Sequence, residues 1–258
     1  MPSEQRGVDD ERLAAALADV ERLAREKQAL SEEVDGLRQE LARFVYIASH
    51  DLRAPLRAIK SLAEWIAEDV GPDSSQETGE HLQLLRARVD RMDAYLVALL
   101  EYSRVGRMPV AVERVDAAEL VKEVIGEVNP PPTMTLDVVV ADDVVPFETA
   151  RASLERVLFQ VIGNAVGHHD RPDGRVEVRV NRSGDELCVA VSDDGPGIAP
   201  KHHDRAFELF QSLCRRDEVG GCGMGLPSAK KIVETAGGRI ELRSEGRGTL
   251  VRFTWPLR

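Results

Sequence analysis

The segment Phe44-Val-Tyr-Ile-Ala-Ser-His-Asp-Leu-Arg-Ala-Pro-Leu56 lies within the longest apolar repeat of the chain. The repeat slips by one residue around His50 and resumes at Leu52. A phase change of this kind is absorbed by local over- or underwinding of a helix, and Pro55 removes a backbone amide from the same segment. Residues two apart in a helix lie roughly 200° apart around its axis, so the His50 imidazole should point away from the Leu52 stripe. We therefore expect a long, locally soft helix with His50 facing water.

Upstream of this segment the apolar repeat spans more than four heptads, which is typical of a coiled coil. Valine at the first seam position with leucine at the second favours two parallel strands, and Lys27 at a first seam position would fix the register. The two seam positions are occupied by Leu13, Val20, Val34 and Leu41, and by Ala16, Leu23, Leu30, Leu37 and Phe44. We predict a parallel homodimeric coiled coil over residues 8–44. The alternative is a single amphipathic helix packed on its own domain.

Downstream, a second amphipathic helix follows a turn at residues 71–75 and runs to about Arg104. One apolar stripe on each helix cannot close a core within one chain, whereas two copies can bury both stripes as a four-helix bundle. The stripe on the second helix consists of Leu82, Leu85, Val89, Met92, Leu96 and Leu99. Residues 45–104 are therefore predicted to form a helical hairpin that dimerises.

After a short linker at residues 105–109, residues 110–258 alternate between strand and helix patterns. Helices are expected near 117–128, 149–167 and 227–236. Strands are expected near 136–140, 176–180, 187–192, 239–243 and 249–254. This order predicts an α/β sandwich with helices over one face of a mixed sheet, and the whole chain is an α+β multidomain protein.

Composition narrows the class of function. The 258 residues are 43% apolar and 31% charged, with a formal charge of -11, which suits a soluble protein and disfavours a nucleic-acid-binding surface. No window approaches a membrane span, and we expect a cytoplasmic protein. The three cysteines, Cys188, Cys214 and Cys222, have the spacing of neither a disulfide framework nor a zinc site. Any input to the chain would come from an upstream sensor domain or protein acting through the coiled coil, or it would arrive by another route.

The stretch from Phe44 to Leu56 resembles the phosphoacceptor box of sensor histidine kinases. An exposed imidazole can act as a nucleophile toward a phosphoryl group, and the adjacent Asp51 carboxylate can accept or orient its proton so that the far nitrogen attacks. The catalytic pair would be His50 and Asp51. A lone helical His beside Asp is more often an ordinary surface residue, so this interpretation depends on the motifs that follow.

The segment Asp193-Asp-Gly-Pro-Gly197 follows an apolar strand and resembles the DxGxG box of the ATPase superfamily that includes these kinases. The resemblance implies that Asp193 accepts a hydrogen bond from the adenine amino group, while Gly195 and Gly197 let backbone approach the base. Alone, this pattern is a common turn.

A second glycine box, Gly221-Cys-Gly-Met-Gly225-Leu226, precedes a helix expected to open with Pro227. Backbone amides at such a helix N-terminus can bind phosphate oxygens, which implies cofactor contacts from Gly221, Gly223, Gly225 and Leu226. A flexible loop is the alternative. The stretch around Phe207 resembles the phenylalanine box, and residues 211–220 would form the nucleotide lid.

The segment from Leu154 to Ala165 resembles the asparagine box. Asn164, with Gln160 one turn earlier, would provide side-chain oxygens for Mg²⁺, a hard ion that takes few protein ligands alongside phosphates and water. His168 would lie near the base. An Asn in a helix interior is unfavourable unless its side chain is satisfied, which supports a functional interpretation.

Several residues depart from the family pattern. Gln160 stands where a first Asn is usual, Gly167 replaces a frequent Lys or Arg, and His168 replaces a frequent aromatic. The missing cation could be replaced by His168, His169 or Arg171, or by Arg215 and Arg216 in the lid. Ala54 replaces the Thr or Asn that positions water for phosphatase activity in the family, so we expect a poor phosphatase.

The resemblance implies an enzyme that binds ATP and Mg²⁺, phosphorylates His50 and passes the phosphoryl group to an aspartate of a response regulator. An alternative is a pseudokinase that acts as a dimeric scaffold, which Gln160 and Gly167 mildly favour. A general ATPase or chaperone of the superfamily is disfavoured because those proteins lack an upstream phosphoacceptor helix and usually carry a Glu where Gln160 stands.

Overall fold

The computed structural model describes residues 2–71, 75–106, 110–211 and 223–257, and it describes the side chains from residue 19 onward except that of residue 38. Among the predicted site residues Gly221 lies outside this description, as do residues 212–220 of the expected lid and the seam side chains of Leu13 and Ala16. The chain divides into two compact units, Met1–Asp51 and Leu52–Arg258, which are described separately.

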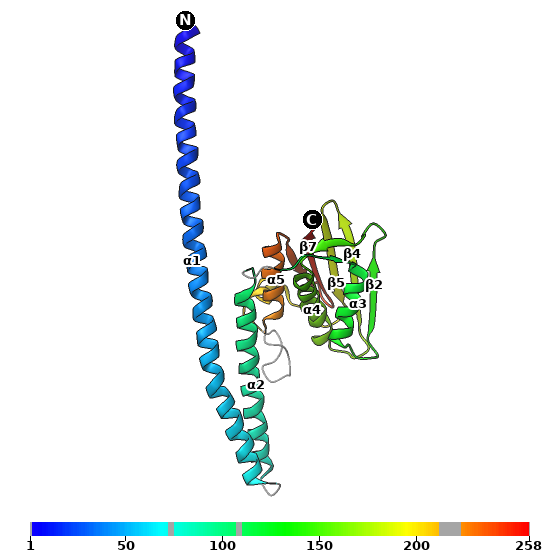
Figure 1. Ribbon diagram of the computed structural model, residues 1–258. Coiled ribbons are helices and arrows are strands. Elements are labelled where there is room, and N and C mark those ends of the chain that lie inside the picture. The colour runs from blue at the N-terminus through cyan, green and yellow to red at the C-terminus, as the bar shows by residue number, and fades with distance from the viewer. Residues whose placement is uncertain (1, 72–74, 107–109, 212–222, 258) are drawn as a thin grey trace. The chain divides into compact units, whose positions relative to one another are not determined.

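The first unit is the N-terminal part of helix α1, which runs from Pro2 to Val70 (Figure 1). The predicted seam leucines lie open on this helix: Leu23, Leu30 and Leu37 are 58%, 65% and 59% exposed. Water-exposed leucines in a regular repeat leave an apolar surface that a partner helix could cover. The helix is confirmed, and its pairing into a coiled coil stays a prediction.

In the second unit, the C-terminal part of α1 and helix α2, Gln76–Arg104, form the predicted hairpin (Figure 1). Leu56, Ala63 and Val89 are buried, and the ion pair between Lys60 and Asp90 links the two helices at 2.7 Å. The helix continues through Pro55 without interruption. Within the described residues, neither helix combines the length and apolarity that crossing a membrane requires.

A five-stranded mixed sheet forms the core of the C-terminal half, with the strand order β2-β4-β5-β7-β6. The β2–β4 pair is parallel and the other pairs are antiparallel. The strands are β2 Thr135–Val140, β4 Arg175–Ser183, β5 Glu186–Asp193, β6 Ile240–Arg243 and β7 Thr249–Pro256. The register of β5 and β7 places Asp193, the last residue of β5, opposite Thr249, the first residue of β7.

Three helices pack on one face of this sheet: α3 Ala117–Val128, α4 Arg151–Gly167 and α5 Gly225–Ala236 (Figure 1). Alternate residues of each strand point toward these helices, as the period of two predicts. The buried strand residues include Val176, Val178, Val180, Leu187, Val189, Val191, Val251, Phe253 and Trp255. The predicted sandwich of helices on a mixed sheet is therefore confirmed.

The structure also contains short elements that the sequence patterns did not indicate. Strands β1, Glu113–Val115, and β3, Phe147–Thr149, pair with each other, and the 3₁₀ turns η1, Pro200–His202, and η2, Asp204–Phe207, follow the DxGxG box. Because Thr149 belongs to β3, helix α4 begins at Arg151 rather than at Thr149. Helix α5 begins at Gly225, so Pro227 lies within its first turn rather than at its first position.

Candidate active site

His50 and Asp51 lie exposed on helix α1. Their side chains are 69% and 72% accessible, and Nδ1 of His50 lies 3.1 Å from Oδ1 of Asp51. If Nδ1 carries the proton and donates it to the carboxylate, the lone pair of Nε2 is left free to attack an electrophile. The expectation of a water-facing imidazole is confirmed, and the Asp51 carboxylate lies within hydrogen-bond distance of the ring.

Asp193 ends strand β5, and backbone amides fix its carboxylate. Oδ1 accepts hydrogen bonds from the amides of Gly195, at 2.9 Å, and Thr249, at 3.2 Å, whereas Oδ2 accepts none from the described residues. Burial raises the pKa of the Asp193 carboxyl, and the two amide hydrogen bonds partly oppose this. One oxygen is therefore used to set the orientation, and the other is available to an external amine.

The glycines of the same box also pack against the β6–β7 loop. A Cβ on Gly197, whose φ is +75°, would lie 2.1 Å from the Gly246 carbonyl oxygen, and one on Gly195 would lie 2.9 Å from Oδ1 of Asp193. Gly197 therefore has no room for a side chain beside the Gly246 backbone, whereas a Cβ on Gly195 would push against the Asp193 carboxylate. These contacts give a structural reason for both glycines, beside the expected approach to a base.

Helix α4 directs two carboxamide oxygens at the first residue of α5. A Cβ built on Gly225 would lie 2.8 Å from Oε1 of Gln160 and 3.8 Å from Oδ1 of Asn164. Two neutral oxygen donors next to a helix N-terminus suit Mg²⁺ that is shared with phosphate and water. The structure thus brings together the two residues predicted to bind metal.

Among the residues that the structure describes, no side chain caps the N-terminus of α5. The first backbone amides of a helix lack intrahelical partners, so an uncapped start can bind phosphate oxygens. Gly223 precedes it with a φ of +66°, and its carbonyl accepts a hydrogen bond from the Phe210 amide. Leu226 is buried behind this end, where it anchors α5 in the core.

His168 and Phe207 flank these elements. His168 directly follows α4, and its surroundings lower the pKa of its imidazole by desolvation, an effect that Asp193 partly opposes. Despite this desolvation, His168 is exposed at the surface. Phe207 lies in η2, packs against the core and carries Lys230 over its ring, at 5.4 Å from the centroid. Both positions are compatible with a nucleotide-binding role.

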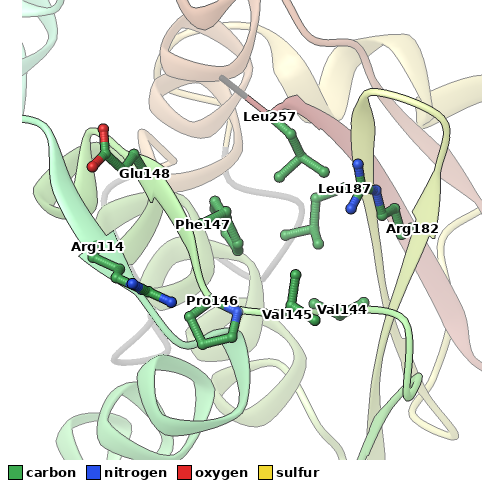
Figure 2. A pocket seen from close by; sticks show the side chains of 9 residues that line it. All are labelled: Arg114, Val144, Val145, Pro146, Phe147, Glu148, Arg182, Leu187 and Leu257. Atoms are coloured by element: carbon green, nitrogen blue, oxygen red, sulfur yellow. The ribbon is translucent and has the colours of Figure 1, made fainter.

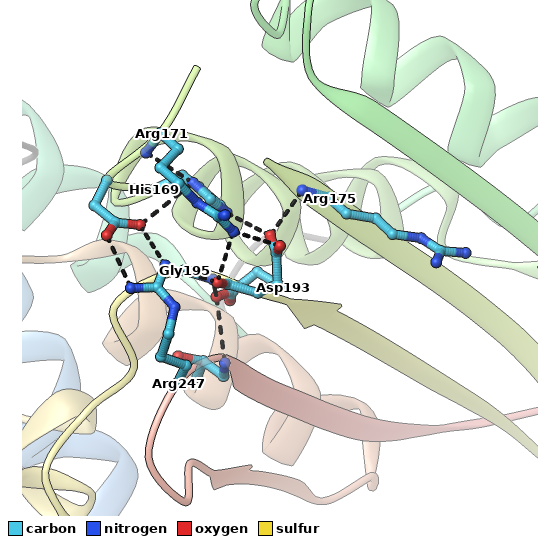
Figure 3. Close-up of polar contacts among 9 residues, drawn as sticks. His169, Arg171, Arg175, Asp193, Gly195 and Arg247 are labelled. Atoms are coloured by element: carbon cyan, nitrogen blue, oxygen red, sulfur yellow. Dashed lines mark hydrogen bonds and ion pairs between the residues drawn. The ribbon is translucent and has the colours of Figure 1, made fainter. Parts of the chain in front are cut away.

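Two of the residues suggested as substitutes for the missing phosphate-binding cation have other partners. The imidazole of His169 and the guanidinium of Arg171 both bind the carboxylate of Asp194 (Figure 3). A side chain held in such a contact is not free to reach a phosphate. Two further candidates, Arg215 and Arg216, lie outside the described residues.

A separate cavity of about 360 Å³ lies beside β3 and the β4–β5 hairpin (Figure 2). It is lined by Arg114, Val144, Val145, Pro146, Phe147, Glu148, Arg182, Leu187 and Leu257. None of the predicted site residues lines it. Among the described residues, no group of three or more His, Cys, Asp or Glu side chains could hold a metal ion.

Comparison with known families assigns both halves of the chain. Residues 40–107 match the His Kinase A (phospho-acceptor) domain, and residues 149–258 match the domain of the histidine kinase-, DNA gyrase B- and HSP90-like ATPases. The two matches occur in the order that the sequence motifs predict. The chain belongs to the histidine kinase family.

Two histidine kinases are among the curated relatives of the chain. The methanogenesis regulatory histidine kinase FilI of Methanothrix harundinacea is 33% identical over 93% of this chain and 27% of its own length. The sensor histidine kinase MtrB of Mycobacterium leprae is 32% identical over 98% of this chain and 45% of its own length. The chain therefore spans less than half the length of these relatives.

Two solved structures share the fold of the kinase. Full-length ShkA, in complex with AMPPNP, has a TM-score of 0.61 and 22% identity over 83% of this chain and 45% of its own. The Acinetobacter baumannii histidine kinase AdeS has a TM-score of 0.57 and 18% identity over 81% of this chain and 98% of its own. At these identities the likeness concerns the arrangement of helices and sheet.

Sequence reasoning missed three residues that shape the Asp193 site. Thr249 donates its amide to Asp193, Arg247 donates to the Asp194 carbonyl oxygen at 3.0 Å, and Gly248 packs so closely that a Cβ would lie 2.5 Å from the Asp193 carbonyl oxygen. All three lie more than fifty residues downstream of Asp193. The only local signal was the pair of glycines, Gly246 and Gly248, immediately before a strand.

Proposed function

We propose that this chain is an ATP-dependent kinase that phosphorylates its own His50 and passes the phosphoryl group to an aspartate of a response regulator. The observation that carries the proposal is the exposed His50 imidazole with the Asp51 carboxylate 3.1 Å from its Nδ1, within the matched phosphoacceptor domain. In this step Nε2 forms a bond to the γ-phosphorus and the bond to the ADP oxygen breaks. Asp51 holds or accepts the Nδ1 proton.

Nucleotide binding would use the residues gathered around Asp193. Its free Oδ2 accepts a hydrogen bond from the exocyclic amine of adenine, and the amides at the N-terminus of α5 bind the phosphates. Gly195 and Gly197 hold the turn, while His168 and Phe207 border the nucleotide. The match of residues 149–258 to the ATPase domain supports this assignment.

The side-chain oxygens of Asn164 and Gln160 would hold Mg²⁺, because both converge on Gly225 next to the phosphate-binding amides. When bound, the ion neutralises the charge of the triphosphate. The chain's own contribution is to fix two oxygen ligands in one helix turn. Gln160 stands where the family usually has Asn. Its longer side chain still ends in a carboxamide, so it retains an oxygen atom that can bind the ion.

We propose the domain boundaries that the sequence patterns indicate: a coiled coil over residues 8–44, a dimerisation and phosphotransfer hairpin over 45–104, and a catalytic domain over 110–258. We propose a homodimer, since the seam leucines and the hairpin residues Leu85 and Met92 are exposed in a single chain. An upstream sensor domain or protein would act through the coiled coil, which agrees with the greater length of the relatives.

The competing function is a pseudokinase that acts as a dimeric scaffold, which the substitutions at Gln160 and Gly167 favour. Incubation with γ-labelled ATP and Mg²⁺, in parallel with a His50→Gln variant, separates the two. The kinase incorporates acid-labile label, and the variant incorporates none. If the wild-type chain binds ATP in a calorimetric titration but takes up no label, the scaffold function stands instead.

A further inference from the structure

A buried histidine supports the turn that carries Asp193. His169 lies two residues after the end of α4, and its side chain is 1% exposed. Its Nδ1 accepts a hydrogen bond from the Arg171 amide at 3.1 Å, and its Nε2 lies 2.8 Å from Oδ1 of Asp194 (Figure 3). Since Nδ1 is used as an acceptor, the proton resides on Nε2, and His169 donates to the carboxylate.

Asp194 is held by several donors at once. Its Oδ1 also accepts a hydrogen bond from the Arg175 amide at 2.8 Å, and its Oδ2 accepts one from the Arg171 guanidinium. These contacts hold the pKa of the Asp194 carboxyl far below its ordinary value. The hydrogen bond from the Arg175 amide lowers this pKa most, and the hydrogen bond from His169 has the next largest effect. Asp194 is therefore ionised throughout the working range of an enzyme.

A third loop joins the same cluster through Arg247. Its guanidinium donates to both carboxylate oxygens of Asp170, at 3.1 and 2.9 Å, and to the Asp194 carbonyl oxygen at 3.0 Å (Figure 3). The backbone of Asp194 is thus clamped on its carbonyl side while its carboxylate is anchored by His169. These contacts tie the exit of α4, the end of β5 and the β6–β7 loop together.

The imidazole fills a slot between two glycines. A Cβ on Gly174 would lie 2.1 Å from the His169 ring, and one on Gly195 would lie 3.4 Å from its Cδ2 atom. Close packing of this kind leaves the ring a single orientation. A surface histidine that only contributed charge would need no such slot.

We propose that His169 is a positioning residue for nucleotide binding. By anchoring Asp194, His169 fixes the turn that contains Asp193. Oδ2 of Asp193, which accepts no hydrogen bond from the described residues, is therefore oriented before the nucleotide binds, and binding has to order less of the turn. The inference rests on the proposed ATP-binding function and adds a determinant of affinity to it. Because His169 acts on the turn that holds the base, it should affect the affinity for nucleotide rather than the rate of phosphoryl transfer.

Two substitutions at position 169 separate hydrogen bonding from packing. His169→Leu keeps the apolar bulk and removes both hydrogen bonds, whereas His169→Gln can donate to Asp194 and accept from the Arg171 amide. We expect the Leu variant to raise both the Kd for ADP and the KM for ATP about tenfold, the loss expected for a charge-assisted hydrogen bond, with kcat changed less than about twofold. The Gln variant should recover most of the affinity.

A structural control is available in Trp255, whose Nε1 donates to Thr149 Oγ1 at 2.7 Å within the core and outside this cluster. Trp255→Phe should lower Tm and leave KM for ATP unchanged. If His169→Leu does not fold, Arg247→Met, at a residue that is 56% exposed on the surface, takes its place with the same expected rise in KM.

The outcomes distinguish this inference from the proposed function. A folded Leu variant that binds ADP as tightly as wild type overturns the role of His169 while leaving the kinase assignment intact. Equal losses in the Leu and Gln variants, or a fall in kcat at unchanged KM, also overturn it. Absence of ADP binding by the wild-type chain would instead remove the proposed function.

Discussion

Nδ1 of His50 and Oδ1 of Asp51 lie 3.1 Å apart on the exposed surface of helix α1. Adjacent residues of a helix usually diverge, and here the carboxylate turns back toward the ring. The contact selects the tautomer in which Nε2 is the free nucleophile. We therefore propose this pair as the functional unit of the phosphoacceptor segment.

Replacing Asp51 with Asn should slow autophosphorylation about a hundredfold, because the amide can still accept the Nδ1 hydrogen bond but cannot take the proton. The measurement is the initial rate of label incorporation from γ-labelled ATP at saturating nucleotide. The affinity for ATP should be unchanged, which serves as the control. A variant as fast as wild type would mean that Asp51 has no part in proton handling.

Asp193→Asn should abolish nucleotide binding without destabilising the fold. Because burial raises the pKa of this carboxyl in the folded state, its ionisation costs stability above that folded pKa, and the cost disappears as the pH falls through it. Asn removes the charge, and its side-chain oxygen can still accept from Gly195 and Thr249. Its amide group, however, presents a donor to the adenine amine.

We therefore expect a Tm at neutral pH equal to or above that of wild type, together with loss of calorimetric ADP binding. In the wild-type chain, ADP affinity should fall as the pH is lowered through the raised pKa, since the protonated carboxyl presents a weaker acceptor. A variant that keeps wild-type affinity would show that another residue holds the base.

Ala54→Thr should introduce phosphatase activity toward the phosphorylated response regulator. Ala54 is exposed and lies four residues after His50, where a hydroxyl could position water and a methyl group cannot. The test compares the rate of phosphate release from the labelled regulator with and without the variant. An Ala54→Ser variant is the matched control for the hydroxyl. Equal rates in all three chains would refute the role given to position 54.

The double substitution Leu30→Asp and Leu37→Asp should shift the chain from dimer toward monomer. Burying one leucine contributes about 2 kcal/mol, and two charges in each seam would add repulsion across the pair. Sedimentation at several concentrations measures the shift. Gln39→Asp, which changes charge on the exposed side of the same helix, is the control. If both variants stay dimeric, residues 8–44 do not drive assembly.

Local signals predicted the regular elements well. Helix α3 has the predicted bounds because Asp116 caps its first amides and Asn129 ends it in a left-handed conformation, immediately before three prolines. By contrast, β1 and β3 are three residues each, and their pairing joins segments more than thirty residues apart. Too few residues show the period of two for such strands to be detected from sequence.

The motifs placed the candidate residues in one domain but did not predict the contacts that they make. Motif order placed Asp193, Asn164 and Gly225 in one domain, and the structure brings Asn164 to Gly225 as expected. The support of Asp193 by Thr249, and of its neighbour by His169, depends on loops that meet only in the folded sheet. Nothing in the local sequence marks His169 as buried.

Mapping the phosphoryl group after incubation with Mg-ATP tests the central claim most directly. Trypsin should release His50 in the peptide Phe44–Arg53, which also contains Tyr46 and Ser49. We expect fragment spectra taken at neutral pH to show one added phosphoryl group on His50, and we expect acid to remove it. Phosphate on Tyr46 or Ser49, or a peptide that stays unmodified while ATP is bound, would contradict the account.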